Sequence, residues 1–193
     1  MDSIVVKKVN YEIVERINSY LLRVKNGEQV YFVYDFSHNI DAFLDFKFAY
    51  KRLKNAGVTI PKVITIDKKT ARAVVEEVNG DTVFDLLRQK DLDEKIIEQA
   101  FILNYKARIN RLRLDFNPTS FIFDGEKLYY TPFTFTEYIR DEDFTQKEIR
   151  LWFYTTEFKN LLIEKGLPID KSRMKNEYER NKEIVLLVVK YFR

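Results

Sequence analysis

The sequence predicts an α+β fold of two lobes, in which a small antiparallel sheet with one helix is followed by a mainly helical second lobe. Residues 5–36 and 61–78 are rich in the β-branched and aromatic residues that favour strands. Most apolar residues beyond position 80 instead follow helical spacing. The composition changes at Asn79-Gly80-Asp81, a turn that can act as a hinge. We therefore expect an N-terminal lobe over residues 1–78 and a C-terminal lobe over residues 79–193.

The N-terminal lobe is predicted to contain five strands and one helix. Asn26-Gly27 separates two runs of alternating apolar and polar residues, and this dipeptide accepts the positive φ angles of a type I′ hairpin turn. A helical pattern begins at Ile40 and stops before Gly57, which can take the left-handed conformation that ends a helix. The expected elements are one strand before residue 19, strands at 19–25 and 29–36, a helix at 40–56, and strands at 61–67 and 71–78.

The C-terminal lobe is predicted to be helical around one hairpin. Asp81 is placed to cap a short helix, and Asp91 to cap a long helix that leads into a loop at Asp115. Asp124-Gly125 then marks a hairpin turn rather than a ligand. The expected elements are a helix at 83–87, a long helix containing residues 96–109, a loop and hairpin within 113–130, a helix at 145–165 and a final helix at 171–192.

The final helix carries the run Ile184-Val185-Leu186-Leu187-Val188-Val189, which is apolar on every helical face. The usual reason for such a run is a last helix buried against the core of the protein. The alternative is an interface for another subunit.

Composition excludes several classes of functional site. The chain has no cysteine, which excludes disulfides, thiol catalysis and thiolate metal sites, and its single histidine, His38, excludes histidine-rich metal centres. The net charge of +3 is too small to indicate a nucleic-acid partner by itself. No apolar run reaches the roughly 20 residues that span a bilayer, and the first residues lack a signal-peptide pattern. We expect a cytoplasmic protein without a membrane span, in which any metal would need oxygen ligands.

The stretch from Arg113 to Tyr130 carries the pattern that is most informative about function. Asp115 stands at the entrance of the loop before the hairpin, where a carboxylate can act as a general base. The same residue can instead brace the loop by accepting backbone hydrogen bonds, as many loop aspartates do. Arg108, Arg111 and Arg113 cluster at the end of the long helix, either as solvated cations at the negative end of its dipole or as contacts for phosphate or RNA.

The order of these elements resembles the eukaryotic-type protein kinase fold in its small bacterial and archaeal branches, such as the RIO, aminoglycoside and lipopolysaccharide kinases. The resemblance covers about residues 15–135 and is carried by residues 56–64, 75–81 and 114–133. It implies that Glu76, Glu77 and Val78 form the strand and linker that touch adenine. It also implies that Asp115 is the base that accepts the proton of a substrate hydroxyl. ATP and Mg²⁺ would be the cofactors of an active member.

The chain departs from the kinase pattern where that pattern holds phosphates and metal. The resemblance puts Tyr34 and Phe46 at the positions of the third-strand lysine and of the glutamate on the following helix. Ser120 replaces the asparagine that ligates magnesium, and Pro132 replaces the aspartate that is the main magnesium ligand. The phosphate-covering loop, at residues 15–19, contains no glycine to let backbone amides approach a phosphate.

These departures favour a pseudokinase, which is a kinase-like protein that lacks normal phosphotransfer and acts as a binding or regulatory module with a protein partner. Two alternatives stay open at the level of sequence. One is an active atypical kinase with Asp115 as base and with displaced carboxylates as metal ligands; the other is an RNA-associated binding module that uses the arginine cluster. The carboxylates that could replace the missing ligands are Asp35, Asp45, Asp124 and the run Asp141-Glu142-Asp143.

Overall fold

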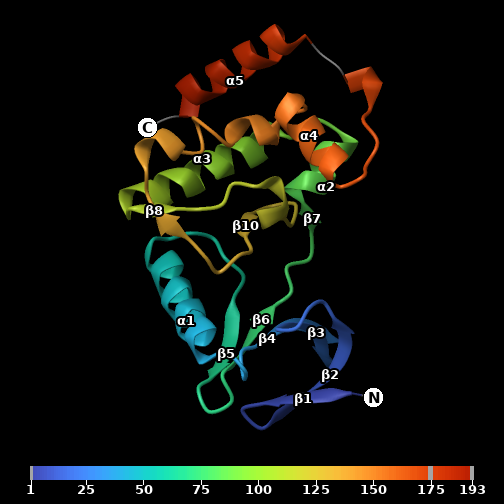
Figure 1. The fold of residues 1–193 in the computed structure, drawn as a ribbon, viewed down its shortest axis with the longest axis vertical. Helices are drawn as coiled ribbons and strands as arrows, with labels where there is room; N and C mark the ends of the chain where they lie inside the picture. Colours follow the sequence, from blue (N-terminus) through green and yellow to red (C-terminus); the bar gives the residue numbers. More distant parts are fainter. Residues whose placement is uncertain (1, 174–175, 192–193) are drawn as a thin grey trace. The chain divides into compact units, whose positions relative to one another are not determined.

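The computed structural model describes residues 2–173 and 176–191 of the chain (Figure 1). Its elements form two compact units. The first unit comprises Met1–Arg52 and Ile60–Asn79, and the second comprises Leu53–Thr59 and Gly80–Arg193. The last passage from one unit to the other falls between Asn79 and Gly80, in the turn where the composition changes. Residues 53–59, which precede the predicted boundary, group with the second unit.

The first unit is built from one antiparallel sheet and one helix, so the predicted α+β class is confirmed. Neighbouring strands follow the order β1-β2-β3-β4-β6-β5, and α1 lies in sequence between β4 and β5. The guanidinium of Arg72 on β6 donates a hydrogen bond to the carbonyl of Val5 on β1 at 3.1 Å, because the sheet is curled (Figure 1). The bounds are β1 Ser3–Val6, β2 Val9–Arg16, β3 Leu21–Asn26, β4 Gln29–Asp35, α1 Ile40–Asn55, β5 Val63–Asp67 and β6 Arg72–Glu76.

The hairpin and the helix predicted in this unit form, but the turn of the hairpin is Gly27-Glu28 rather than Asn26-Gly27, because Asn26 pairs with Gln29 and has no positive φ. Gly27 follows Asn26 with a φ of 62°, between β3 and β4. α1 ends at Asn55, and Gly57 has a φ of 73°. The amide of Val58 donates to the carbonyl of Leu53 at 3.1 Å, which satisfies a carbonyl of the last helical turn.

The sheet has six strands rather than the five that the sequence predicted, because residues before the first expected hairpin form a hairpin of their own. Its turn consists of Lys7 and Lys8, whose φ angles of 47° and 71° belong to the type I′ geometry that Asn-Gly adopts at lower cost. The carboxylate of Asp67 accepts hydrogen bonds from the amides of Lys7 at 3.1 Å and Lys69 at 3.0 Å. Asp67 therefore joins two turns of the unit. The first turn contains no glycine, asparagine or proline, so the sequence does not predict it.

The second unit combines helices with two small sheets, of strand order β10-β9-β7 and β11-β8. Both sheets are antiparallel. The bounds are β7 Asp81–Thr82, α2 Val83–Gln89, α3 Glu94–Ile109, β8 Leu112–Arg113, η1 Pro118–Ser120, β9 Phe121–Phe123, β10 Leu128–Tyr130, β11 Thr136–Glu137, η2 Arg140–Glu142, η3 Ile149–Trp152, α4 Thr156–Glu164, η4 Lys171–Arg173 and α5 Glu177–Tyr191.

The two helix caps predicted for this unit are wrong in detail. Thr82, not Asp81, caps α2, and its hydroxyl oxygen accepts a hydrogen bond from the amide of Asp85 at 3.0 Å. Asp93 precedes α3, without a side-chain cap. Asp91 lies too early in the chain for that role and instead binds two arginines from the C-terminal region.

The helix predicted at residues 145–165 is wrong over its first half, because η3 ends at Trp152 and α4 begins only at Thr156. The buried indole of Trp152 donates to the carbonyl of Phe116 at 2.7 Å. The amide of Thr155 donates to the carbonyl of Phe153 at 2.7 Å, in a tight turn between the two elements. Tertiary contacts here outweigh the local preference for a continuous helix.

The final helix, α5, is held to the rest of its unit by a buried arginine. It begins later than predicted, and residues 174, 175 and 192 of the expected span lie outside the described residues. Arg180 is buried and donates to both carboxylate oxygens of Asp91 at 3.0 Å each, while Arg173 donates to Asp91 at 2.8 Å.

None of the helices in the described part of the chain combines the length and the apolar composition that a membrane-spanning helix needs.

Replacing Lys7-Lys8 by Asn-Gly is expected to stabilise the protein by about 1 kcal/mol. Each left-handed lysine costs roughly 1–2 kcal/mol, and the greater freedom of glycine in the unfolded chain cancels part of the gain. Urea unfolding measures the change, and a lower midpoint than that of the wild type would contradict it. The control Lys68→Asn with Lys69→Gly removes the same charges at residues without positive φ, so it should bring no gain.

The anchoring of α5 is expected to weaken in acid. Burial by itself raises the pKa of Asp91, but hydrogen bonds from Arg173 and Arg180 outweigh it, so the net pKa is lowered. A lowered pKa means that the stabilisation is complete above the unfolded value and is lost as the pH falls through the folded value. Because the side chain of Asp91 is 45% exposed and solvent screens its charge, Asp91→Asn should cost only about 0.5–1 kcal/mol at pH 7 and almost nothing near pH 2, by urea unfolding. Asp93→Asn, at the exposed neighbour, should show no such loss.

Candidate functional site

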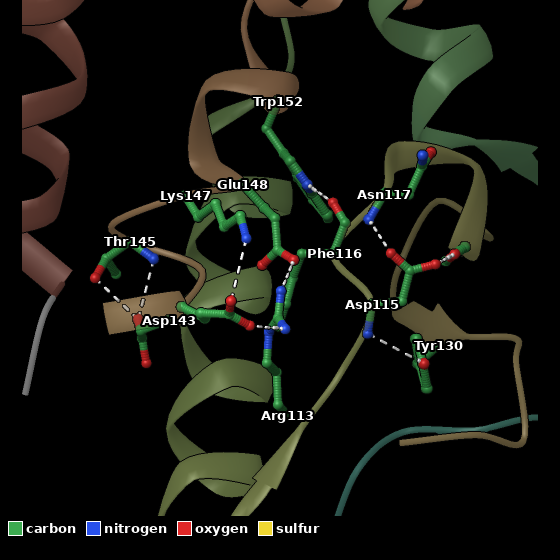
Figure 2. A network of polar contacts seen from close by, with 12 residues as sticks. Arg113, Asp115, Phe116, Asn117, Tyr130, Asp143, Thr145, Lys147, Glu148 and Trp152 are labelled. Carbon is green, nitrogen blue, oxygen red and sulfur yellow. Dashed lines mark hydrogen bonds and ion pairs between the residues drawn. The ribbon is translucent and has the colours of Figure 1, made fainter. Parts of the chain in front are cut away.

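Asp115 lies in the loop between β8 and η1, with its carboxylate bound to its own loop (Figure 2). One oxygen accepts a hydrogen bond from the amide of Asn117 at 3.0 Å, and the other accepts one from the hydroxyl of the buried Ser120 at 2.8 Å. The amide of Asp115 donates to the hydroxyl of Tyr130 at 3.2 Å. The structure thus brings Asp115 and Ser120, two positions singled out separately in the sequence, into contact, and the loop-bracing role of Asp115 is present. Because Asp115 is exposed and a carboxylate has about four acceptor sites, it can still accept a hydrogen bond from a ligand.

Local sequence explains the shape of this loop. Asn117 caps η1 through a hydrogen bond from the amide of Thr119 at 3.0 Å, and Pro118 stands at the first position of the turn, where its missing N–H costs nothing. The following hairpin turns at Asp124, which accepts hydrogen bonds from the amides of Glu126 at 2.8 Å and Lys127 at 2.7 Å. Asp124 is therefore a turn residue, as predicted.

The loop rests on a buried aromatic cluster. The ring of Phe116 stacks on Phe121 with centroids 5.1 Å apart and on Phe144 at 4.3 Å. Trp152 packs edge-on against Phe121 at 5.1 Å, and its indole holds the carbonyl of Phe116. Burial raises the pKa of Tyr130, which lies 5.2 Å from Phe121. Phe121 and Tyr130 of the hairpin are therefore buried in the core of the unit.

Arg113 is committed to two glutamates (Figure 2). Its guanidinium binds Glu142 and also binds Glu148 at 2.8 Å. Burial raises the pKa of Glu148, and the charge of Arg113 opposes that rise. Arg113 therefore neutralises a carboxylate that would otherwise be buried alone.

The other two arginines of the predicted cluster have different surroundings. Arg108 is half-buried, with its guanidinium 5.8 Å from the ring of Tyr105. Arg111 is exposed and has a φ of 57°. The three arginines thus differ in burial and in partners.

Two residues of the acidic run 141–143 make structural contacts. Glu142 binds Arg113 and Lys147. Asp143 is buried and accepts hydrogen bonds from the side-chain amide of Asn104 at 3.1 Å and from the amide of Thr145 at 3.0 Å. Among residues 2–173 and 176–191, no group of three or more Asp, Glu or His side chains is arranged to hold a metal ion.

Pro132 follows β10 and offers no side-chain oxygen. The preceding Thr131 is engaged with the loop, because both its amide and its hydroxyl donate to the carbonyl of Ser120, at 2.9 and 3.1 Å. Asp35, another proposed replacement ligand, pairs with Arg72 at 3.1 Å in the first unit.

In the first unit, Tyr34 and Phe46 face each other. Their ring centroids are 5.2 Å apart, and both belong to an aromatic group with Phe36 between β4 and α1. Burial raises the pKa of Tyr34 to about 12, and nearby Tyr20 adds to the rise. The strand position and the helix position identified by the resemblance are therefore in contact, and both are aromatic rather than charged.

The predicted adenine-side linker consists of the last residue of β6 and the two residues after it, and both of its glutamates have partners in the first unit. Glu76 accepts a hydrogen bond from the amide of Lys62 at 2.9 Å. Glu77 forms a two-point ion pair with Arg23, with distances of 2.7 and 3.1 Å. Val78 is half-buried.

Several partners of the candidate residues were not predictable from the sequence. The Arg113–Glu148 pair joins positions 35 residues apart, and the Trp152–Phe116 contact joins positions 36 residues apart. No local spacing signals contacts over such separations; only the long-range fold reveals them.

Arg113→Met is expected to destabilise the protein by about 2–3 kcal/mol, because it leaves Glu148 buried without a counter-charge. The second change Glu148→Gln should recover part of that loss, and Arg111→Met should stay within about 0.5 kcal/mol of the wild type. Urea unfolding measures all three variants. An Arg113→Met variant of full stability that binds RNA less tightly would contradict this structural role.

No protein-family model and no curated protein matches this chain.

Proposed function

We propose that this chain is a kinase-like protein without normal phosphotransfer, a pseudokinase that acts as a binding or regulatory module for a protein partner. The contact between Tyr34 and Phe46 carries the proposal. A kinase uses a charged pair at these two places, because its lysine must gather phosphates and its glutamate must hold that lysine. Here two aromatic rings occupy them, packed at a tilt of 33° with centroids 5.2 Å apart.

The order of elements in the first unit supports the kinase-like part of the proposal. Counting from β2, the third strand is β4, and α1 follows it directly. The strands β2-β3-β4-β6-β5 are neighbours in that order, all antiparallel. A helix after the third strand is what the resemblance requires for the lysine and glutamate positions to meet.

The loop of the second unit supports the part of the proposal that concerns lost turnover. Asp115 keeps the position of the catalytic base, but its nearest polar partner is the hydroxyl of Ser120 rather than a metal-binding amide. A neutral hydroxyl and the ring of Pro132 are poor substitutes for oxygen ligands of Mg²⁺.

The contributions of the missing groups to the rate of phosphoryl transfer indicate whether the chain would be a slow kinase or an inactive one. Positioned cations and donors supply most of the rate of phosphoryl transfer, and one arginine contact alone contributes roughly 10³–10⁵. Loss of the phosphate-binding lysine and of two metal ligands therefore exceeds what a single remaining carboxylate can compensate. A preserved scaffold with aromatic and ion-paired positions is suited to holding a partner rather than to turnover.

Thermal unfolding in the presence of MgATP tests this proposal. At a ligand concentration equal to Kd the stabilisation is RT ln 2, about 0.4 kcal/mol, which moves Tm by about 1 °C for a protein of this size. We expect a smaller shift at about 5 mM MgATP, and no transfer of labelled phosphate to protein or small-molecule acceptors.

Two carboxylate variants make the test decisive. A Mg²⁺-dependent rise in Tm, with phosphotransfer that Asp115→Asn abolishes and Asp124→Asn retains, would establish an active kinase and overturn the proposal. Asp124 is the matched control because it is a carboxylate of the same loop and hairpin region that serves only the hairpin turn.

A further inference from the structure

The outer side of α5 exposes large apolar side chains. Tyr178 and Val189 are each 75% exposed, Leu186 is 61% exposed and Val185 is 59% exposed. On the inner side, Ile184 and Arg180 are buried. The usual explanation of an all-apolar last helix, burial against the core, therefore accounts for only one side of α5. Exposed apolar patches of this kind mark interaction sites.

The outer side has the spacing of a helix-pairing seam. Tyr178, Lys182, Val185 and Val189 follow one another at steps of four, three and four residues, which places them in one stripe along the helix. The long apolar stem of Lys182 can cover a neighbouring side chain while its ammonium stays in water. A stripe of this kind fits the equivalent stripe of another helix.

In an antiparallel pair of α5 helices, the charges beside the stripe of one copy would meet opposite charges of the other copy. Glu179 and Lys190 are 11 residues apart, so they lie only about 20° apart around the helix axis, on the same flank of the stripe. Both are equally distant from the midpoint between Ile184 and Val185. A two-fold axis at this midpoint therefore places Glu179 of one copy beside Lys190 of the other.

Both charges are exposed on the surface of the helix, and one of them already has a partner within the chain. Within the described residues, Glu179 has no ion-pair partner. Lys190 binds Glu94, and its ammonium has further donors for a second carboxylate.

We propose that α5 is the interface of an antiparallel, two-fold symmetric dimer of this chain. A second copy fits better than an unrelated partner, because one patch supplies both the apolar stripe and the opposite charges that an isologous interface needs. This inference uses no part of the proposed pseudokinase function. One 15-residue helix from each copy buries less than the standard interface of roughly 1,600 Å², so the dimer should be weak and depend on concentration.

Sedimentation velocity over a concentration series tests the association. The wild type should shift from monomer to dimer as its concentration rises through the micromolar range, and Val185→Glu should remain a monomer. Ile163→Glu on α4 is the matched control, because Ile163 is equally exposed at 59% but lies outside α5. A wild type that is monomeric at every concentration overturns the proposal, as does a Val185→Glu variant that still dimerises.

Cross-linking tests the antiparallel arrangement, and the absence of natural cysteines makes single-cysteine variants clean. Val185→Cys places thiols beside the two-fold axis, so a short bifunctional maleimide should link two copies. Tyr178→Cys places them about 20 Å apart along the axis, so it should not link. Equal cross-linking of both variants would indicate a parallel pair and overturn the arrangement.

Charge reversal supplies a test that does not require loss of apolar surface. Glu179→Lys alone and Lys190→Glu alone should each dimerise less, because each homodimer sets like charges together. Their mixture should form a heterodimer, in which both contacts join opposite charges. A mixture no more associated than its components overturns the proposal, provided that circular dichroism shows both variants folded.

Discussion

The hydrogen bond from the buried indole of Trp152 to the carbonyl of Phe116 is the constraint on which the second unit depends. A buried indole N–H or main-chain carbonyl without a partner costs about 1–3 kcal/mol, so each group needs the other. Their contact places η3 against the loop and seats Phe116 among Phe121 and Phe144. It also explains why the chain leaves helical geometry between η3 and α4. Asp115 lies next to this fixed point, so its position follows from the core.

The polar residues around this loop share a second feature, which is that they satisfy one another. Asp115 binds the hydroxyl of Ser120, and Arg113 binds two glutamates. In the first unit, Glu77 is occupied by Arg23. A site built for phosphate needs donors and ligands that stay available until the substrate arrives. Here these groups hold the scaffold together, which is the physical basis for proposing a kinase-like protein that binds rather than catalyses.

The helix α5 uses its two sides for different purposes. Its inner side combines one buried isoleucine with an arginine that needs Asp91, so its attachment depends on charge as well as on packing. Its outer side keeps an apolar stripe in water, which is unfavourable in an isolated chain. Association through the outer side would remove that cost without disturbing the inner side.

Elements with local signals can be predicted from the amino-acid sequence alone. Gly27 provides the positive φ of the turn between β3 and β4, and α1 ends at Asn55, two residues before Gly57, which takes the left-handed conformation. Asp124 serves its hairpin through amides two and three residues away, and Asp115 braces its loop over five residues. Contacts this short depend on neighbouring residues alone.

Contacts between residues that are far apart along the chain depend on the tertiary structure. The turn at Lys7 and Lys8 is bound by the carboxylate of Asp67. Trp152, at the end of η3, donates to the carbonyl of Phe116. Asp91 does not cap α3 but pairs with Arg180. Whether another element covers the apolar face of α5 also depends on tertiary packing, and the spacing of apolar residues in the sequence does not predict it. Local propensities differ by less than the free energy of one buried polar contact, so those contacts decide wherever the two disagree.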